Sequence, residues 1–439
     1  MSQARSQSRP KVAAITTVWR RDSHADVIVP KLLAGYDLDG RPVQPAVAVA
    51  SLYVDQCPAN DLSRAWATRF GVPIAQSVRQ ALTLGTGSLA VDAVLIVAEH
   101  GEYPWNEKGQ HLYPRRELFA QTIEVIRAAG RPVPVFVDKH LSYSWESAHW
   151  MYDTARALGV PLMAGSSLPV TLRYPDLDLP LGSDVQEAVV ISHGPTESYG
   201  FHALETLQCM VERRRGGETG VAAVETVHGG AFWAAWEAGR FPHALCEAAL
   251  AASERHAGSA QDFFRDRPPA DSEARGSVPG PHPPLAFLVE YRDGLRATLL
   301  NLNGYVADFA FAARVAPAGA AGGAVAGAPA AERALPQPPE AAVVATCFKL
   351  ERRRPRWHFS FLVHHVEQFF LTGRAPYPVE RTLLTTGTLA ALMDAADAGR
   401  RLETPHLAIR YAPPEVAWAR SHGRSLPPEE VWGFDPDEV

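Results

Sequence analysis

Short apolar runs alternate with longer segments of helical periodicity in the first half of the chain. Residues 91–98 form a nearly continuous apolar run, which is typical of a central strand covered on both faces. Other strands are expected at residues 11–19, 46–54, 134–137 and 160–164, and helices from Ser23 onward and at 61–70, 115–129 and 145–158. Strands that alternate with helices imply right-handed crossovers, so we expect an α/β domain with a Rossmann-like, doubly wound parallel sheet over residues 10–168.

The pattern changes after Pro169. Strands are expected at 187–192, 221–227, 286–291, 297–301 and 343–350, and helices at 201–214, 359–370 and 382–398. This order predicts an α+β domain with a mostly antiparallel sheet over residues 169–405, which would bind substrate or form a dimer, and a tail over 406–439. Segments 265–284 and 316–339 are rich in Pro and charge or in small residues, so we expect flexible insertions there.

Composition narrows the class of protein. The 439 residues suit two or three domains, and 46% hydrophobic with 21% charged residues excludes a disordered or coiled-coil chain. The net charge of −6 offers no basic field for nucleic acid or anionic lipid, and no apolar run approaches the roughly 20 residues of a membrane span. We therefore expect neither a nucleic-acid partner nor a membrane partner.

The cysteines and the amino terminus indicate a compartment. The first eleven residues are polar and basic, and no apolar segment follows them, so this pattern does not predict a secretory signal. The four cysteines lie far apart without a Cys-x-x-Cys pair, which argues against a disulfide scaffold and a thiolate zinc site. They are Cys57, Cys209, Cys246 and Cys347. A cytoplasmic enzyme is the resulting expectation.

Polar side chains follow the expected strands of the first domain. The carboxyl ends of neighbouring parallel strands converge on one crevice, so these residues are expected to approach one another there. They are His100, Glu102, Asp138 and His140. Imidazole and carboxylate suit zinc, manganese or iron, but without a compact His-x-x-x-His spacing a polar rim for a hydroxylated substrate is preferred to a divalent metal site. Asp55, after residues 46–54, is either a ribose acceptor or an ordinary turn residue.

Four segments, taken in order, resemble the Gfo/Idh/MocA family of glucose–fructose oxidoreductase and inositol dehydrogenase. Asp138-Lys139-His140 stands where the family has Glu-Lys-Pro, and Ser198 and His202 stand in its Asp-x-x-x-His-x-x-Asp motif. The strand that ends at Gly165 and the sequence Gly-Arg-Arg-Leu-Glu at 399–403 also fit the family's order. Each motif alone is weak, whereas the order covers most of the chain.

The resemblance implies hydride transfer between NAD or NADP and a hydroxyl of a sugar, cyclitol or similar small molecule. By position, Lys139 would stabilise the developing alkoxide and His202 would take the proton. Ser198 would lie on the substrate side. The family commonly dimerises through the sheet of its second domain, so a homo-oligomer is expected.

One departure marks a divergent branch. The family's Gly-x-Gly-x-x-Gly fingerprint is missing, and the first strand is followed by Trp-Arg-Arg-Asp-Ser-His at residues 19–24. Arg20, Arg21 and the following helix N-terminus would then have to hold the diphosphate. Two alternatives stay open. In one, the fold has lost nicotinamide and His100, Glu102, Asp138 and His140 support a metal-assisted lyase, isomerase or hydrolase; in the other, the protein binds a ligand without catalysis.

Overall fold

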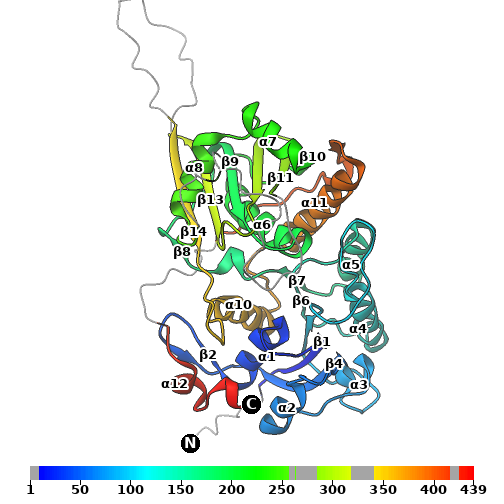
Figure 1. The fold of residues 1–439 in the computed structure, drawn as a ribbon. Coiled ribbons are helices and arrows are strands. Elements are labelled where there is room, and N and C mark those ends of the chain that lie inside the picture. The colour runs from blue at the N-terminus through cyan, green and yellow to red at the C-terminus, as the bar shows by residue number, and fades with distance from the viewer. Residues whose placement is uncertain (1–8, 257–262, 264–283, 318–340, 416–424) are drawn as a thin grey trace, which may run out of the picture.

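A five-stranded parallel sheet forms the base of the protein. A computed structural model describes residues 9–256, 263, 284–317, 341–415 and 425–439 (Figure 1). The strand order is β4 (Ala48–Gln56), β1 (Lys11–Val18), β5 (Ala93–Val97), β6 (Val135–Asp138) and β7 (Leu162–Gly165). All four neighbouring pairs are parallel, and every residue of β5 is buried. The Rossmann-like sheet predicted from the apolar runs is therefore confirmed.

Helices cover both faces of this sheet. The helices of this part of the chain are α1 (His24–Ala34), α2 (Ser63–Phe70), α3 (Val78–Thr83), α4 (Arg115–Ala129) and α5 (Trp145–Ala157). One core cluster joins the sheet to α1 and to α10 (His358–Thr372), and another joins its opposite face to α3, α4 and α5. Helix α10 lies within the range expected for the second domain, yet it packs against α1, because its apolar side faces the first sheet.

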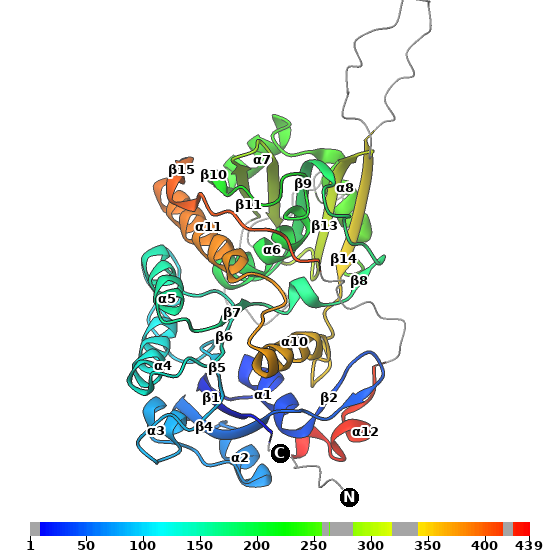
Figure 2. The same cartoon turned by 180° about the vertical axis from the view of Figure 1, so that it is seen from behind.

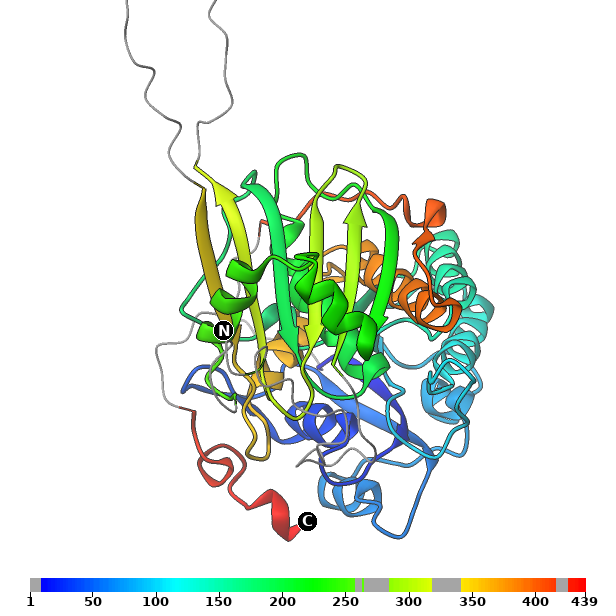
Figure 3. The same ribbon diagram turned by 45° about the horizontal axis from the view of Figure 1, so that its top comes forward.

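The second sheet has eight strands and is mostly antiparallel, as expected. Its order is β15 (Leu402–Glu403), β10 (Val221–His228), β11 (Leu285–Tyr291), β12 (Arg296–Asn301), β9 (Asp184–Ser192), β13 (Phe309–Ala316), β14 (Ala342–Phe348) and β8 (Arg173–Tyr174). Among the described strands, β9 and β12 form the parallel pair. Helices α6 (Thr196–Val211) and α11 (Val379–Ala398) pack on one face, and α7 (Gly230–Glu237) and α8 (His243–Ala252) cover the other (Figure 3).

The sequence pattern missed some of these elements. Helix α6 begins at Thr196, five residues before the first apolar position of its expected range, and β13, α7 and α8 were not expected. The expected insertions at 265–284 and 316–339 lie outside the described residues, apart from residues 284, 316 and 317. None of the helices in the described residues is both long and apolar enough to cross a membrane.

Small elements complete the chain. They are β2 (Tyr36–Asp37), β3 (Pro42–Val43), α12 (Pro428–Trp432) and the 3-10 turns Leu168–Val170, Pro405–Leu407 and Pro436–Glu438. The end of the chain returns to the first unit, where the indole N–H of Trp432 donates to the Gly35 carbonyl at 2.7 Å. Figure 2 shows α12 beside β2, far from the second sheet.

Helix α11 connects the two units and sets the position of the site between them. The Thr382 hydroxyl donates to the Ala164 carbonyl of β7 at 2.7 Å, and the Thr386 hydroxyl accepts from the Leu141 N–H after β6 at 3.2 Å. The buried guanidinium of Arg381 donates to Glu212, which follows α6. These contacts hold α6 above the carboxyl edge of the parallel sheet (Figures 1 and 2).

Candidate active site

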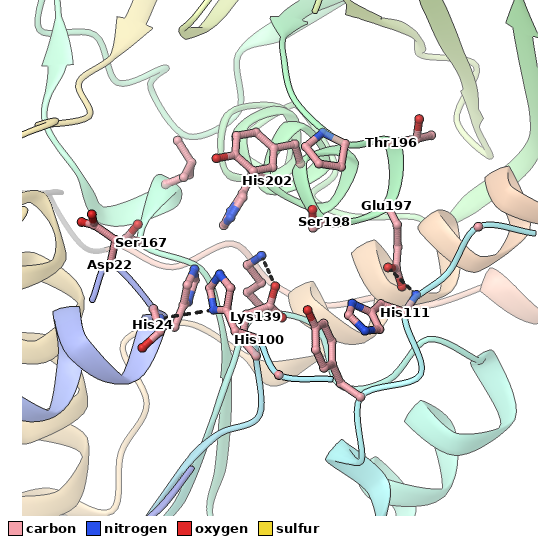
Figure 4. Close-up of a pocket in the computed structure, with 18 of the residues that line it drawn as sticks. Asp22, His24, His100, His111, Lys139, Ser167, Thr196, Glu197, Ser198 and His202 are labelled. Atoms are coloured by element: carbon pink, nitrogen blue, oxygen red, sulfur yellow. Dashed lines mark hydrogen bonds and ion pairs between the residues drawn. The ribbon is translucent and has the colours of Figure 1, made fainter. Parts of the chain in front are cut away.

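A cavity of about 1150 Å³ lies between the carboxyl edge of the parallel sheet and the second unit. It is lined by the turn between β1 and α1, by the loops that follow β5 and β6, by the first two turns of α6 and by the start of α10 (Figure 4). This is the crevice where ligands of open α/β sheets bind. The residues that line it determine what the protein can bind.

Lys139 enters this cavity from the end of β6. Its φ of 63° places the residue in the left-handed region, and its ammonium lies 2.7 Å from Oε1 of Glu99, which follows β5. Arg115 binds the other oxygen of Glu99 from the start of α4. Burial alone opposes ionisation of Glu99, but these two cations hold its pKa well below the ordinary value. Glu99 is thus an anion that holds the Lys139 ammonium in position.

His202 faces Lys139 from the second turn of α6. Figure 4 shows both side chains pointing into the same cavity, one from the sheet edge and one from the helix. Burial, assisted by the positive charge of Lys139, lowers the His202 pKa well below its ordinary value. Within the described residues Nδ1 of His202 has no hydrogen-bond partner. The imidazole is therefore neutral near pH 7, and its Nδ1 is buried.

His24, the first residue of α1, joins this group. Its Nδ1 lies 2.6 Å from Oδ2 of the buried Asp138, and its backbone N–H donates to Nδ1 of His100 at 3.4 Å. The His24 ring centroid is 5.4 Å from that of His100 and 6.3 Å from that of His202. Burial lowers the pKa of His100 to about 3, so that ring is neutral.

Glu197 and an aromatic stack form the substrate-facing wall. Oε2 of Glu197 accepts from the His111 backbone N–H at 2.9 Å, whereas Oε1 has no partner within the described residues. Burial raises the Glu197 pKa to about 7. The His111 ring lies 4.1 Å from both the Trp105 and Tyr113 rings, and Trp105 is 61% exposed. A hydrogen-bonding carboxyl beside flat apolar rings suits a molecule with both hydroxyl groups and C–H faces.

The residues predicted from the sequence divide into two groups. Those that line the cavity are Lys139, His202, His100, Ser198, Arg20 and Arg21, and Asp138 contacts it through His24. Asp55 does not line it: its carboxylate accepts from the Tyr53 hydroxyl at 2.8 Å and the Tyr103 hydroxyl at 2.6 Å beside another pocket. The prediction that Asp55 is a ribose acceptor in this cavity is therefore wrong, because Tyr53 and Tyr103 hold its carboxylate beside another pocket.

The expected grouping of His100, Glu102, Asp138 and His140 is wrong. Glu102 is exposed to solvent, and the His140 ring is buried against Phe201, with Nδ1 2.9 Å from the Ser142 carbonyl oxygen. The left-handed backbone at Lys139 breaks the strand alternation that would have placed Asp138 and His140 on one face. No group of three or more His, Cys, Asp or Glu residues that could hold a metal ion occurs among the described residues. The metal-assisted alternative thus loses its ligand set.

Sequence reasoning did not single out His24, Glu99 or Glu197 as functional residues. Glu99 directly follows the apolar run 91–98, so its place at a strand end was a usable signal. His24 lies in the turn where the family's glycine fingerprint is missing. Glu197 lies four residues before the expected start of its helix at residue 201.

The turn between β1 and α1 departs from a glycine-rich anion site. The backbone N–H of Asp22 donates to Oδ2 of Asp26 at 3.0 Å, and that of Asp26 donates to the Ser23 hydroxyl at 3.3 Å. Arg21 is paired with Asp437 at 2.9 Å. The Arg20 guanidinium lines the cavity and has no hydrogen-bond or ion-pair partner within the described residues. The cavity thus extends from a cation at this turn to Lys139.

Comparisons with known proteins find similarity of structure. No family model matches the chain, and no curated protein sequence matches it. GenD2 from gentamicin A biosynthesis, in a crystal structure with NAD, aligns over 91% of this chain and 97% of its own at 17% identity with a TM-score of 0.51. Myo-inositol dehydrogenase from Lactobacillus casei, with NAD(H) and myo-inositol, aligns over 90% and 96% at 10% identity and a TM-score of 0.49. The GenD2 match supports the Gfo/Idh/MocA resemblance at the level of fold.

Proposed function

We propose that the protein is an oxidoreductase that transfers a hydride between a nicotinamide dinucleotide and a hydroxyl of a sugar, cyclitol or similar polyhydroxylated small molecule. The observation that carries this proposal is that the Lys139 ammonium and the His202 imidazole open into one cavity, which also reaches the turn after β1. GenD2, which shares the fold, was crystallised with NAD.

The two polar groups have complementary roles. When bound, the nicotinamide ring supplies the hydride acceptor for oxidation of a secondary alcohol. His202, which lines the cavity, takes the hydroxyl proton as the general base. The Lys139 ammonium stabilises the negative charge that develops on the substrate oxygen. Glu99 and Arg115 hold Lys139 in place, so the charge is oriented before the reaction begins.

Cofactor and substrate would use different ends of the cavity. Arg20 and Asn60 line the part next to the turn after β1, and we assign them to the diphosphate and ribose. Glu197, Ser198 and the aromatic stack line the other part, and we assign them to the substrate. NAD or NADP is the cofactor in this proposal, and which of the two is preferred is decided by experiment.

Titration of the full chain with NADH and NADPH, followed by nicotinamide fluorescence, tests the proposal. We expect saturable binding of at least one, and reduction of the matching oxidised cofactor when sugars and cyclitols are screened as substrates. Absence of binding at millimolar cofactor would overturn the oxidoreductase assignment. Binding of polyols without turnover would favour the non-catalytic alternative.

A cytoplasmic location and a homo-oligomeric state stay predictions from the sequence. Helices α7 and α8 cover the outer face of the second sheet.

A further inference from the structure

We propose that His24, oriented by Asp138, relays the proton between the buried His202 and solvent. This inference rests on the proposed function, because it follows the proton that the substrate hydroxyl releases. His24, in the first turn of α1, lies where the family's glycine fingerprint is missing, and the proposal gives this side chain a part in proton transfer.

The first step is the orientation of the ring. Nδ1 of His24 lies 2.6 Å from Oδ2 of Asp138, whose side chain is fully buried. A carboxylate only accepts hydrogen bonds, so the proton between these atoms belongs to Nδ1, and the relay uses Nε2 as its proton acceptor. The edge of Phe359, 5.3 Å away between ring centroids, packs on the same imidazole. His24 is thus held as a base by a carboxylate, in the arrangement that orients histidine in acid–base catalysis.

The second step is the need for a relay. Once His202 has taken a proton, its imidazolium is disfavoured by burial and by the nearby Lys139 charge. His202 is buried, whereas His24 is partly exposed and lines the cavity beside the exposed residues Arg20 and Asp22. His24 is therefore the outward member of the pair.

The third step is the path between the rings. Their centroids are 6.3 Å apart and their planes differ by 21°. No direct hydrogen bond joins the two rings within the described residues, so the relay runs through one bridging water or substrate hydroxyl in the cavity that both residues line. The proton leaves His202, crosses the bridging oxygen and binds Nε2 of His24, while the bridging oxygen receives one proton and gives one up. The Asp138 carboxylate then balances the imidazolium charge, and no electrons change hands.

Other titratable groups face His24 from the surrounding elements. They are Asp138 at the end of β6, His100 after β5, His202 on α6, His358 on α10 and the Lys139–Glu99 pair. Burial lowers the pKa values of His100 and His358, so both rings are neutral near pH 7. Asp138 is the carboxylate in direct contact with His24.

A tautomer measurement tests the orientation without cofactor or substrate. In ¹⁵N spectra of the full chain, with His24 assigned through His24→Gln, we expect a protonated Nδ1 and a bare Nε2. Asp138→Asn removes the acceptor that requires the proton on Nδ1, so the Nε2–H form should become populated. An Nε2–H tautomer in the wild type, or no change in Asp138→Asn, would overturn the relay.

A kinetic measurement tests the transfer itself. We expect His24→Gln to lower kcat about 10²-fold with little change in KM, and added imidazole to restore part of the loss. His149 is a matched control, because its Nδ1 lies 3.1 Å from Asp153 on the exposed face of α5; His149→Gln should keep wild-type kcat. A fast His24→Gln enzyme, or a slow one that imidazole does not rescue, contradicts the relay. If the wild type neither binds nicotinamide nor turns over, the oxidoreductase proposal fails, and the tautomer result alone decides the His24–Asp138 orientation.

Discussion

The ammonium of Lys139 lies 2.7 Å from Oε1 of Glu99, across the carboxyl ends of the neighbouring strands β6 and β5. Both side chains are buried, and Arg115 completes the group from α4. A buried carboxylate with two cations leaves one positive charge in excess, and that charge faces the cavity. The arrangement orients an electrophile before any ligand arrives.

Removal of the ammonium should abolish most of the activity. Lys139→Met keeps the length of the side chain but loses the charge that stabilises the substrate alkoxide, so we expect kcat to fall about 10²–10³-fold. Steady-state kinetics with the substrate found by screening measures this. Lys11→Met, at the exposed amino end of β1, should keep wild-type kcat. An active Lys139→Met enzyme would remove Lys139 from the mechanism.

Loss of Glu99 should act on stability as well. Glu99→Gln leaves the buried Lys139 and Arg115 cations without a counter-charge, and breaking a buried ion pair in this way costs about 3–5 kcal/mol of unfolding free energy. Urea denaturation followed by circular dichroism gives the value. Glu403→Gln breaks an exposed pair with Arg401 and should change the midpoint little. A Glu99→Gln protein as stable as the wild type would show that the ion pair is not a structural anchor.

Glu197 should produce a pH dependence. Burial raises its pKa to about 7, so the fraction ionised grows as the pH rises through 7. Because the ionised carboxylate is the better acceptor for a substrate hydroxyl, kcat/KM should increase over the same interval. In Glu197→Gln this rise of kcat/KM with pH should disappear. In Glu102→Gln, at an exposed position outside the cavity, the rise should remain. The prediction is wrong if both variants share the wild-type profile.

Glu205 should make stability fall with rising pH. Burial raises its pKa in the folded protein from 4.5 to about 7, so the folded state binds a proton that the unfolded state releases in this interval. The stabilisation is complete below pH 4.5 and lost as the pH rises to 7, an effect of about 3 kcal/mol. Denaturation of the wild type and of Glu205→Gln across this range should show a flatter profile for the variant. Glu117→Gln, exposed on α4, should follow the wild type.

Arg20 should contribute to cofactor affinity and not to folding. Its guanidinium lines the cavity without a hydrogen-bond or ion-pair partner in the described chain, so Arg20→Ala breaks no internal contact. Loss of one charged hydrogen bond to phosphate should raise the Kd about tenfold. Calorimetric titration with the nicotinamide that binds the wild type measures this, and Arg79→Ala on α3 serves as the exposed control. An unchanged Kd would place the diphosphate elsewhere.

The local pattern of the sequence determined the two sheets and part of the cavity. The apolar run 91–98 predicted the buried β5, and the residues after each strand predicted which edge would be polar. Lys139 and His202 were selected from the order of motifs, and both line the cavity. These inferences succeeded because strand periodicity and the convergence of parallel strand ends are short-range or topological properties, which can be read along the chain.

Only the tertiary structure decided which strand-end side chains meet. His24 and Asp138 are separated by 114 positions, yet they lie 2.6 Å apart, whereas His140 turns away from its neighbour Lys139 to pack on Phe201. The direction of each side chain depends on the backbone angle at the strand end, such as the positive φ of Lys139, and on which helix closes over it. Residue order contains neither quantity, so pairing, burial and protonation at the site follow from packing between distant elements.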